Sequence, residues 1–262
     1  MIDTTKTYLY HYTIFESAVK ILASQKLLFT KVEKLNDINE SMGPICLGVG
    51  NDEQHRFEEL CSAYRQLSFS MDKGSQRGFD IPVMWGHYAA RGHGVCLVFD
   101  KEKIDAEVAK ESSRYSKEVV YTPTDPYLIL YNKGTYGSVD LFISASKDEI
   151  FFHKTKDWEY EQEYRVILID DRDENQYLNI DTSLVAIILY ARKHDVFLNS
   201  IEYCSLSKIH PTLSFYRYIP SSTSGGSWNL YDVKGESIRP KLKLDFDLGK
   251  VFKAKDEPEE ID

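Results

Sequence analysis

The sequence of 262 residues lacks paired cysteines. Its four cysteines are widely spaced and form no CxxC motif: Cys46, Cys61, Cys96 and Cys204. A structural zinc site normally needs such pairs, so this spacing argues against one, and we predict no metal site. We therefore expect reduced and mostly buried thiols, as in a protein of a reducing compartment.

The chain also lacks a long apolar run and an excess of positive charge. No segment approaches the roughly 20 apolar residues that a membrane-spanning helix needs. The start of the chain, "MIDTTKTYLYHYT", has neither a basic nor an apolar signal region. The net charge of −9 argues against a uniformly basic nucleic-acid-binding face, although a local basic groove stays open. We expect a cytoplasmic protein with no membrane partner.

Aromatic residues are abundant, at 13% of the chain with 18 tyrosines, which indicates many strands or a site that stacks flat ligands. No internal repeat and no linker divides the sequence. We predict one α+β domain over residues 1–250, with a mixed, mainly antiparallel sheet flanked by helices. Residues 251–262 are predicted to form an acidic, solvated tail.

Alternation and helical spacing predict the individual elements. Residues 7–12 form an aromatic strand, and Thr13 with Glu16 is expected to form a capping box for a helix that ends near Gln25. The other predicted strands cover 67–71, 94–100, 164–170 and 184–191. The other predicted helices cover 52–67, 83–89, 102–112, 138–153 and 195–208.

Four stretches carry side chains suited to chemistry, and the first is "YHYT" at residues 10–13. His11 ends the first strand just before a helix, where free backbone amides and the helix dipole suit a phosphate or ribose. A buried histidine bonded to a neighbouring strand is the alternative. Neither interpretation is excluded by the residues alone.

The second and third stretches are "SFS" at residues 68–70 and "MWGHYA" at residues 84–89. Ser68 and Ser70 share one face of their strand and could hold a ribose or carboxamide, or simply form its polar face. Trp85 and Tyr88 could stack a nicotinamide or a base, or pack in the core.

The fourth stretch, "WEYEQEYR", has glutamates at alternating positions. If it is extended, Glu159, Glu161 and Glu163 lie on one side. In a cleft, at least one would have a raised pKa and could act in acid–base or cation-stabilising work. Exposed to solvent, the three would be an ordinary charged strand edge, with Arg165 paired to one of them.

Taken in order, these stretches resemble a bacterial family known as domain of unknown function 2971. The matching pieces are "YHYT", "LLFTKVEKLND", "LSFS", "MWGHYAARGHGVCLVF", "KTKDWEYEQEYRVI" and "LVAIILYARKHD". They occur in the order of the family, and the resemblance covers about residues 8–235. The usual "NDPFE" of the family is "NDINE" here, without its proline and aromatic residue.

The layout of that family is similar to that of the ADP-ribosyltransferase superfamily, and this resemblance implies roles for the motif residues. Glu163 would be the catalytic acid and Glu161 the first member of an ExE pair, with His11 on the ribose of NAD. Other residues would line the cofactor site: Tyr12, Thr13, Ser68, Ser70, Trp85 and Tyr88. The breaking nicotinamide–ribose bond develops an oxocarbenium ion that a carboxylate stabilises.

The first hypothesis is therefore an ADP-ribosyltransferase-like enzyme that uses NAD as a substrate and modifies a macromolecular acceptor, protein or nucleic acid. Such an enzyme could be a bacterial toxin, held by an antitoxin protein, or a phage-defence effector. The alternative is a non-catalytic regulatory domain that binds a nucleotide, nucleic acid or partner. A metal-dependent nuclease, with Asp37, Glu161 and Glu163 on magnesium, is the weaker third hypothesis.

Overall fold

The computed structural model describes residues 5–37, 40–41, 45–124, 126, 128–170, 172–191, 196–220, 229–232 and 237–238. The predicted tail at 251–262 and the helix start at Asp195 lie outside these residues. No helix within the described ranges is long and apolar enough to cross a membrane.

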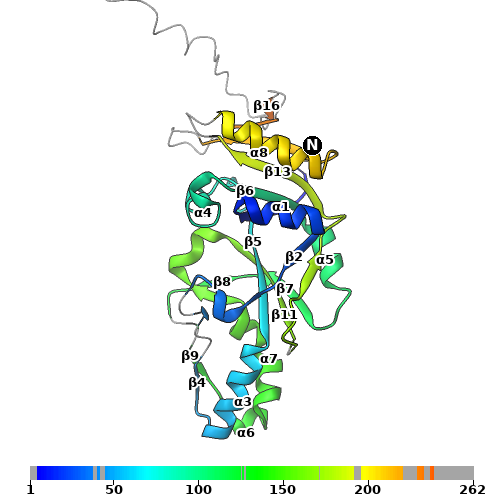
Figure 1. The fold of residues 1–262 in the computed structure, drawn as a ribbon. Helices are drawn as coiled ribbons and strands as arrows, with labels where there is room; N and C mark the ends of the chain where they lie inside the picture. Colours follow the sequence, from blue (N-terminus) through cyan, green and yellow to red (C-terminus); the bar gives the residue numbers. More distant parts are fainter. Residues whose placement is uncertain are drawn as a thin grey trace, which may run out of the picture.

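A large mixed sheet forms the centre of the molecule (Figure 1). Its strands run in the order β16-β15-β14-β13-β6-β1-β5-β11-β7, and β3 joins the edge of β5. Only β13 and β14 are parallel, and the other neighbours within this sheet are antiparallel. The predicted α+β class with a mixed, mainly antiparallel sheet is confirmed.

The strands of this sheet have the following bounds: β1 Tyr8–Thr13, β3 Thr30–Lys31, β5 Tyr64–Met71, β6 Val95–Asp100, β7 Arg114–Glu118, β11 Glu163–Ile169, β13 Leu184–Tyr190, β14 Ser214–Ile219, β15 Asn229–Asp232 and β16 Ser237–Ile238. Three strand pairs lie outside it: β2 Lys26–Leu28 with β12 Tyr177–Asn179, β4 Ile45–Leu47 with β9 Leu128–Leu130, and β8 Val120–Thr122 with β10 His153–Thr155.

The helices are α1 Phe15–Ser24, α3 Asn51–Ser62, α4 Pro82–His87, α5 Lys101–Val108, α6 Lys133–Tyr136, α7 Val139–Phe151 and α8 Val196–Ile209, with 3-10 turns η1 Val32–Lys34, η2 Ala90–Gly92 and η3 Lys156–Glu161. Figure 1 shows α3, α6 and α7 together at the end of the molecule opposite α8.

Alternation along the central strands sends apolar side chains to both faces of the sheet. One face carries Leu9, Phe69 and Leu97, which pack with residues of α1, α5 and α8. The other face carries Tyr10, Cys96 and Val98, which pack with α4. A third cluster, around Phe57 and Phe142, joins α3 and α7. The central strands are therefore buried on both faces, as their continuous apolar runs predict.

Three expectations are corrected at the ends of elements. The capping box does not form, because Ile14 is the N-cap of α1 and no side chain caps the helix. The helix predicted over 52–67 ends at Ser62, because Tyr64 already belongs to the buried strand β5. The stretch 158–161 is not extended: η3 covers it, and β11 begins only at Glu163.

Three of the four cysteines, Cys46, Cys61 and Cys96, are buried as free thiols, while the fourth, Cys204, is exposed. The expectation of mostly buried thiols is confirmed for these residues. Because Cys96 lies in β6, beside β1, its thiol is enclosed by the core.

Gly94 sets the close approach of β6 to the end of β1. A Cβ atom at this position would lie 2.1 Å from the Thr13 carbonyl oxygen and 2.9 Å from the Ala89 Cα. We expect Gly94→Ala to lower the free energy of unfolding by about 2 kcal/mol or more, because backbone atoms must move. Gly86 lies in α4, and a Cβ atom added there would meet no atom within 4 Å outside its own stretch of helix. Gly86→Ala should therefore leave the free energy of unfolding unchanged or raise it by about 0.5–1 kcal/mol. Urea unfolding of both variants measures the difference, and equal stabilities would contradict this packing.

Candidate functional site

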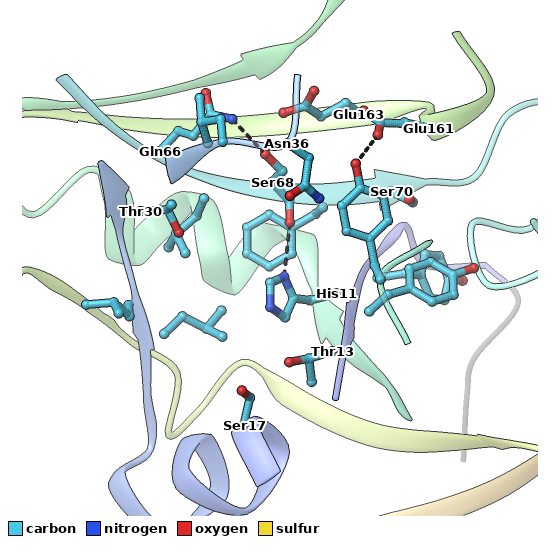
Figure 2. A pocket seen from close by; sticks show the side chains of 18 of the residues that line it. His11, Thr13, Ser17, Thr30, Asn36, Gln66, Ser68, Ser70, Glu161 and Glu163 are labelled. Atoms are coloured by element: carbon cyan, nitrogen blue, oxygen red, sulfur yellow. Dashed lines mark hydrogen bonds between the residues drawn. The ribbon is translucent and has the colours of Figure 1, made fainter. Parts of the chain in front are cut away.

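A cavity of about 840 Å³ opens beside β1 and β5 (Figure 2). Its volume falls within the range of roughly 300–1,000 Å³ typical of small-molecule sites. Its polar wall combines His11, Thr13, Asn36 and Gln66 with the glutamates at the start of β11.

The cavity exists because β1 leaves β5 early. The two strands pair only at Leu9↔Met71 and Tyr10↔Ser70, whereas β1 pairs with β6 over its whole length. Further along, β3 takes over the same edge of β5 at Thr30↔Gln66. Residues 67–69 of β5 therefore have no strand partner on this edge, and the space beside them is the cavity.

The separation of the strands lets side chains from both faces of the sheet reach one cavity. Tyr10, Ser70 and Glu163 lie in one row across the three strands, so they share a face. His11 is offset by one residue and belongs to the opposite face, where its ring meets Phe69 edge-on. Tyr10 and Glu163 lie two strand spacings apart, about 10 Å. His11 and Glu163 both line the cavity.

The half-buried imidazole of His11 has a defined hydrogen bond. Its Nδ1 atom lies 3.1 Å from the carbonyl oxygen of Ser68, in the part of β5 that has no strand partner on the β1 edge. Burial lowers the pKa of the ring, and the bond to this carbonyl opposes that effect. A carbonyl oxygen only accepts, so Nδ1 carries the proton of the neutral ring. Nε2 is then a hydrogen-bond acceptor, suited to a ligand hydroxyl.

Glu163 is a buried carboxylate held by two cations. Both of its oxygens accept from Arg165, with N–O distances of 2.8 Å, and the Lys154 ammonium lies 3.8 Å away. Burial alone would raise the pKa of Glu163, but the charges of Arg165 and Lys154 outweigh it and lower the pKa to about 2. Glu163 is therefore ionised throughout the physiological pH range.

Glu161 behaves differently, although it is also buried. It accepts hydrogen bonds from Tyr88 at 2.5 Å and from Lys154 at 2.8 Å. Burial raises its pKa, and the Lys154 charge only partly opposes this. The two glutamates of the pair thus have their pKa values moved in opposite directions, as is common for carboxylates with separate roles.

Local backbone structure explains why only two of the three glutamates are buried. Because η3 replaces the predicted extended stretch, Glu159 points to solvent and pairs with Lys73 at 3.1 Å. Its side chain is 42% exposed, against 6% for Glu161 and 2% for Glu163. Gln162, in the left-handed conformation at φ 47°, turns the chain into β11.

Most of the predicted site residues line the cavity: His11, Tyr12, Thr13, Ser68, Ser70, Tyr88, Glu161 and Glu163. Tyr12 does so with its hydroxyl already donated to the Gly78 carbonyl, at 2.7 Å. Trp85 does not line the cavity. It is 2% exposed, stacks on Tyr218 and donates from Nε1 to the Phe79 carbonyl, so its role is in the core.

Two residues of the buried charged cluster were missed from the sequence, Glu40 and Lys154, as were the exposed lysines that line the cavity. Lys154 lies 3.5 Å from Glu40, which also binds Arg165. Lys154 further lies 4.5 Å from the centre of the Trp158 ring. An alternating pattern cannot mark Glu40, which is far from the other glutamates in sequence. The isolated polar "HKT" beside an apolar helix was the one available signal for Lys154.

The cations occupy the space between the carboxylates, which does not suit a divalent metal. Within the described residues, no three His, Cys, Asp or Glu side chains are arranged to hold one. The buried cluster contains three carboxylates (Glu40, Glu161 and Glu163) and two cations (Lys154 and Arg165). With all five ionised, it carries a net charge of one negative.

Together these features define an α+β protein with a buried, ionised carboxylate at the wall of a ligand-sized cavity. Residues 84–166, which include β6, the first residues of β11 and the two buried glutamates of η3 and β11, match the family model described as "Protein of unknown function (DUF2971)". Over these residues, the match supports the family resemblance that the motifs indicated. No curated protein and no solved structure matches the chain significantly.

Removing Arg165 should destabilise the fold, because Glu163 and Glu40 would remain buried with less compensation. We expect Arg165→Met to lower the free energy of unfolding by about 3–5 kcal/mol. Lys73→Met, which breaks the exposed pair with Glu159, should cost less than about 1 kcal/mol. Guanidinium unfolding compares the two, and similar losses would show that the buried pair is not special.

The low pKa of Glu163 also predicts a pH dependence. A carboxylate whose pKa is lowered by folding stabilises the protein above its unfolded pKa, near 4.5, and loses this contribution as the pH falls through about 2. The difference in unfolding free energy between the wild type and Glu163→Gln should therefore narrow between pH 5 and pH 2. A difference independent of pH in this window would refute the assigned ionisation.

Proposed function

We propose that this protein is an NAD-binding enzyme of the ADP-ribosyltransferase type. The observation that supports it is that an ionised Glu163 and an acceptor nitrogen of His11 line the same ligand-sized cavity. Hydroxyl groups of a ribose fit such a wall, because the carboxylate and the imidazole both accept hydrogen bonds.

The chemistry follows from the charge of Glu163. When the bond between the nicotinamide nitrogen and ribose C1′ breaks, the nitrogen keeps the electron pair and nicotinamide leaves as a neutral molecule. The positive charge moves to the ribose, where a fixed carboxylate stabilises it. The acceptor then forms a bond to C1′ and loses a proton. Glu161, whose pKa is raised, is the group placed to receive that proton.

The other cavity residues have supporting roles in this proposal. Ser68 and Ser70 lie beside Glu163 on one face of the sheet, where they would contact the nicotinamide ribose or carboxamide. Tyr88, fixed by its bond to Glu161, would offer its ring to the nicotinamide. A macromolecular acceptor, a role as toxin or phage-defence effector, an antitoxin partner and a cytoplasmic location all remain predictions.

A specific observation also favours the second hypothesis, a non-catalytic binding domain. Both Glu163 oxygens are already bound by Arg165, so the cluster can serve the fold alone. In that case the cavity would bind a nucleotide without cleaving it. The nuclease hypothesis gains no comparable support, since Lys154 and Arg165 fill the space among the acids.

Labelled NAD distinguishes the two hypotheses. We expect the wild type to release nicotinamide and label an acceptor in a cell lysate, and Glu163→Gln to do so about 100-fold more slowly or not at all. Glu159→Gln is the matched control, because it removes the same charge four residues earlier in a solvent-exposed side chain. NAD should raise the melting temperature of the wild type and of both variants.

A different result would favour the binding domain. If wild type and Glu163→Gln produce no nicotinamide, yet NAD or another nucleotide raises their melting temperatures, the enzyme hypothesis is wrong and the binding-domain hypothesis is supported. Circular dichroism of Glu163→Gln shows whether a loss of transfer reflects chemistry or a loss of the fold.

A further inference from the structure

Apart from Asp37, the charged residues that line the cavity fall into two groups. One group is the buried carboxylate cluster of η3, β11 and Glu40. The other group consists of three lysines from different elements: Lys20 on α1, Lys26 on β2 and Lys34 on η1. All three are exposed, unlike the nearly buried Lys154. The cavity therefore has an acidic wall and a separate cationic rim.

The rim lysines do not neutralise the acidic wall. Among the described residues, none of them lies within ion-pair distance of a carboxylate, and the buried glutamates are paired with Lys154 and Arg165 instead. Glu16 lies one helical turn before Lys20, but no ion pair joins them. The pKa of Asp173 is lowered mainly by its hydrogen bond with Lys31, and the Lys34 charge makes a smaller contribution. Lys20 and Lys26 are thus the rim charges most available to a ligand.

Small polar side chains also line the cavity. Ser17 is one turn before Lys20 on the same helix, and Thr13 and Thr30 lie across the cavity from each other (Figure 2). Hydroxyl groups of this kind donate to phosphate oxygens, and lysine supplies a mobile point charge for them. A ligand that fits the whole cavity needs hydroxyls at one end and negative charge at the other.

We infer that the cavity takes a nucleoside diphosphate group, with its phosphates at the rim formed by Lys20 and Lys26. In ADP-ribose or NAD, the ribose attached to the second phosphate then extends toward His11 and Glu163. This inference rests on the proposed function, since it uses the same cavity, but it concerns ligand orientation rather than catalysis. It also sets a direction for NAD, with the diphosphate outside and the nicotinamide ribose innermost.

The double variant Lys20→Glu/Lys26→Glu tests this orientation. We expect it to bind ADP-ribose and ADP about tenfold more weakly than the wild type, measured by titration calorimetry at low salt. The control Lys103→Glu/Lys208→Glu changes the net charge equally, at exposed lysines of α5 and α8 outside the cavity lining. It should bind both ligands as the wild type does. All four side chains are exposed, and both variants should remain folded, although Lys103→Glu loses one surface hydrogen bond to the Thr182 carbonyl.

Equal affinity for ADP-ribose in the two double variants would overturn the inference, and so would a failure of the wild type to bind ADP-ribose. Nicotinamide riboside, which lacks the diphosphate, should not distinguish the two double variants, and a loss confined to Lys20→Glu/Lys26→Glu would contradict the assigned orientation. The proposed function can fail independently of this inference. ADP binding that depends on the two lysines, without release of nicotinamide, would support the diphosphate site and contradict the enzyme. ADP-ribose transfer that is insensitive to the two lysines would support the enzyme and contradict the diphosphate site.

Discussion

The bidentate ion pair between Glu163 and Arg165 is the interaction on which the site depends. Both residues start the same central strand, β11, and both are almost fully buried. Two charges in such a place are stable only when their remaining hydrogen-bonding groups are satisfied. Arg165 meets this need by binding the Phe151 carbonyl and Glu40, which ties β11 to the end of α7. Lys154 adds a second cation that links Glu163 to Glu161. The cluster lies at the wall of the cavity, and the proposed function gives its buried charges a role there.

The early separation of β1 from β5 is the second constraint, because it opens a cavity in an otherwise packed sheet. Where the two strands stop pairing, the Ser68 carbonyl is left to accept from His11. The bond both satisfies a buried backbone group and fixes the orientation of the ring. Because the gap reaches both faces of the sheet, a histidine and a carboxylate on opposite faces can act on one ligand.

Much of this arrangement was predictable from the sequence, and the rest had identifiable reasons for failing. Apolar runs predicted the buried strands β6, β11 and β13, because short runs rich in β-branched residues are typical of strands buried on both faces. The alternation of Glu159, Glu161 and Glu163 would place all three on one side only in an extended chain. Because the 3-10 turn η3 covers Glu159 and Glu161, Glu159 points to solvent while Glu161 and Glu163 are buried. Trp85 was expected at the cofactor, but its ring is buried in the core, where it stacks on Tyr218. Glu40 and Lys154 join the site through long-range contacts that no local pattern encodes.

A crystal structure of Glu163→Gln with bound NAD tests the central claim most directly. We expect the dinucleotide in the cavity between β1 and β5, with a ribose hydroxyl on His11 Nε2. C1′ of the nicotinamide ribose should face residue 163. Density for NAD elsewhere on the molecule, or a nicotinamide ribose directed away from residue 163, would contradict the proposed role of Glu163.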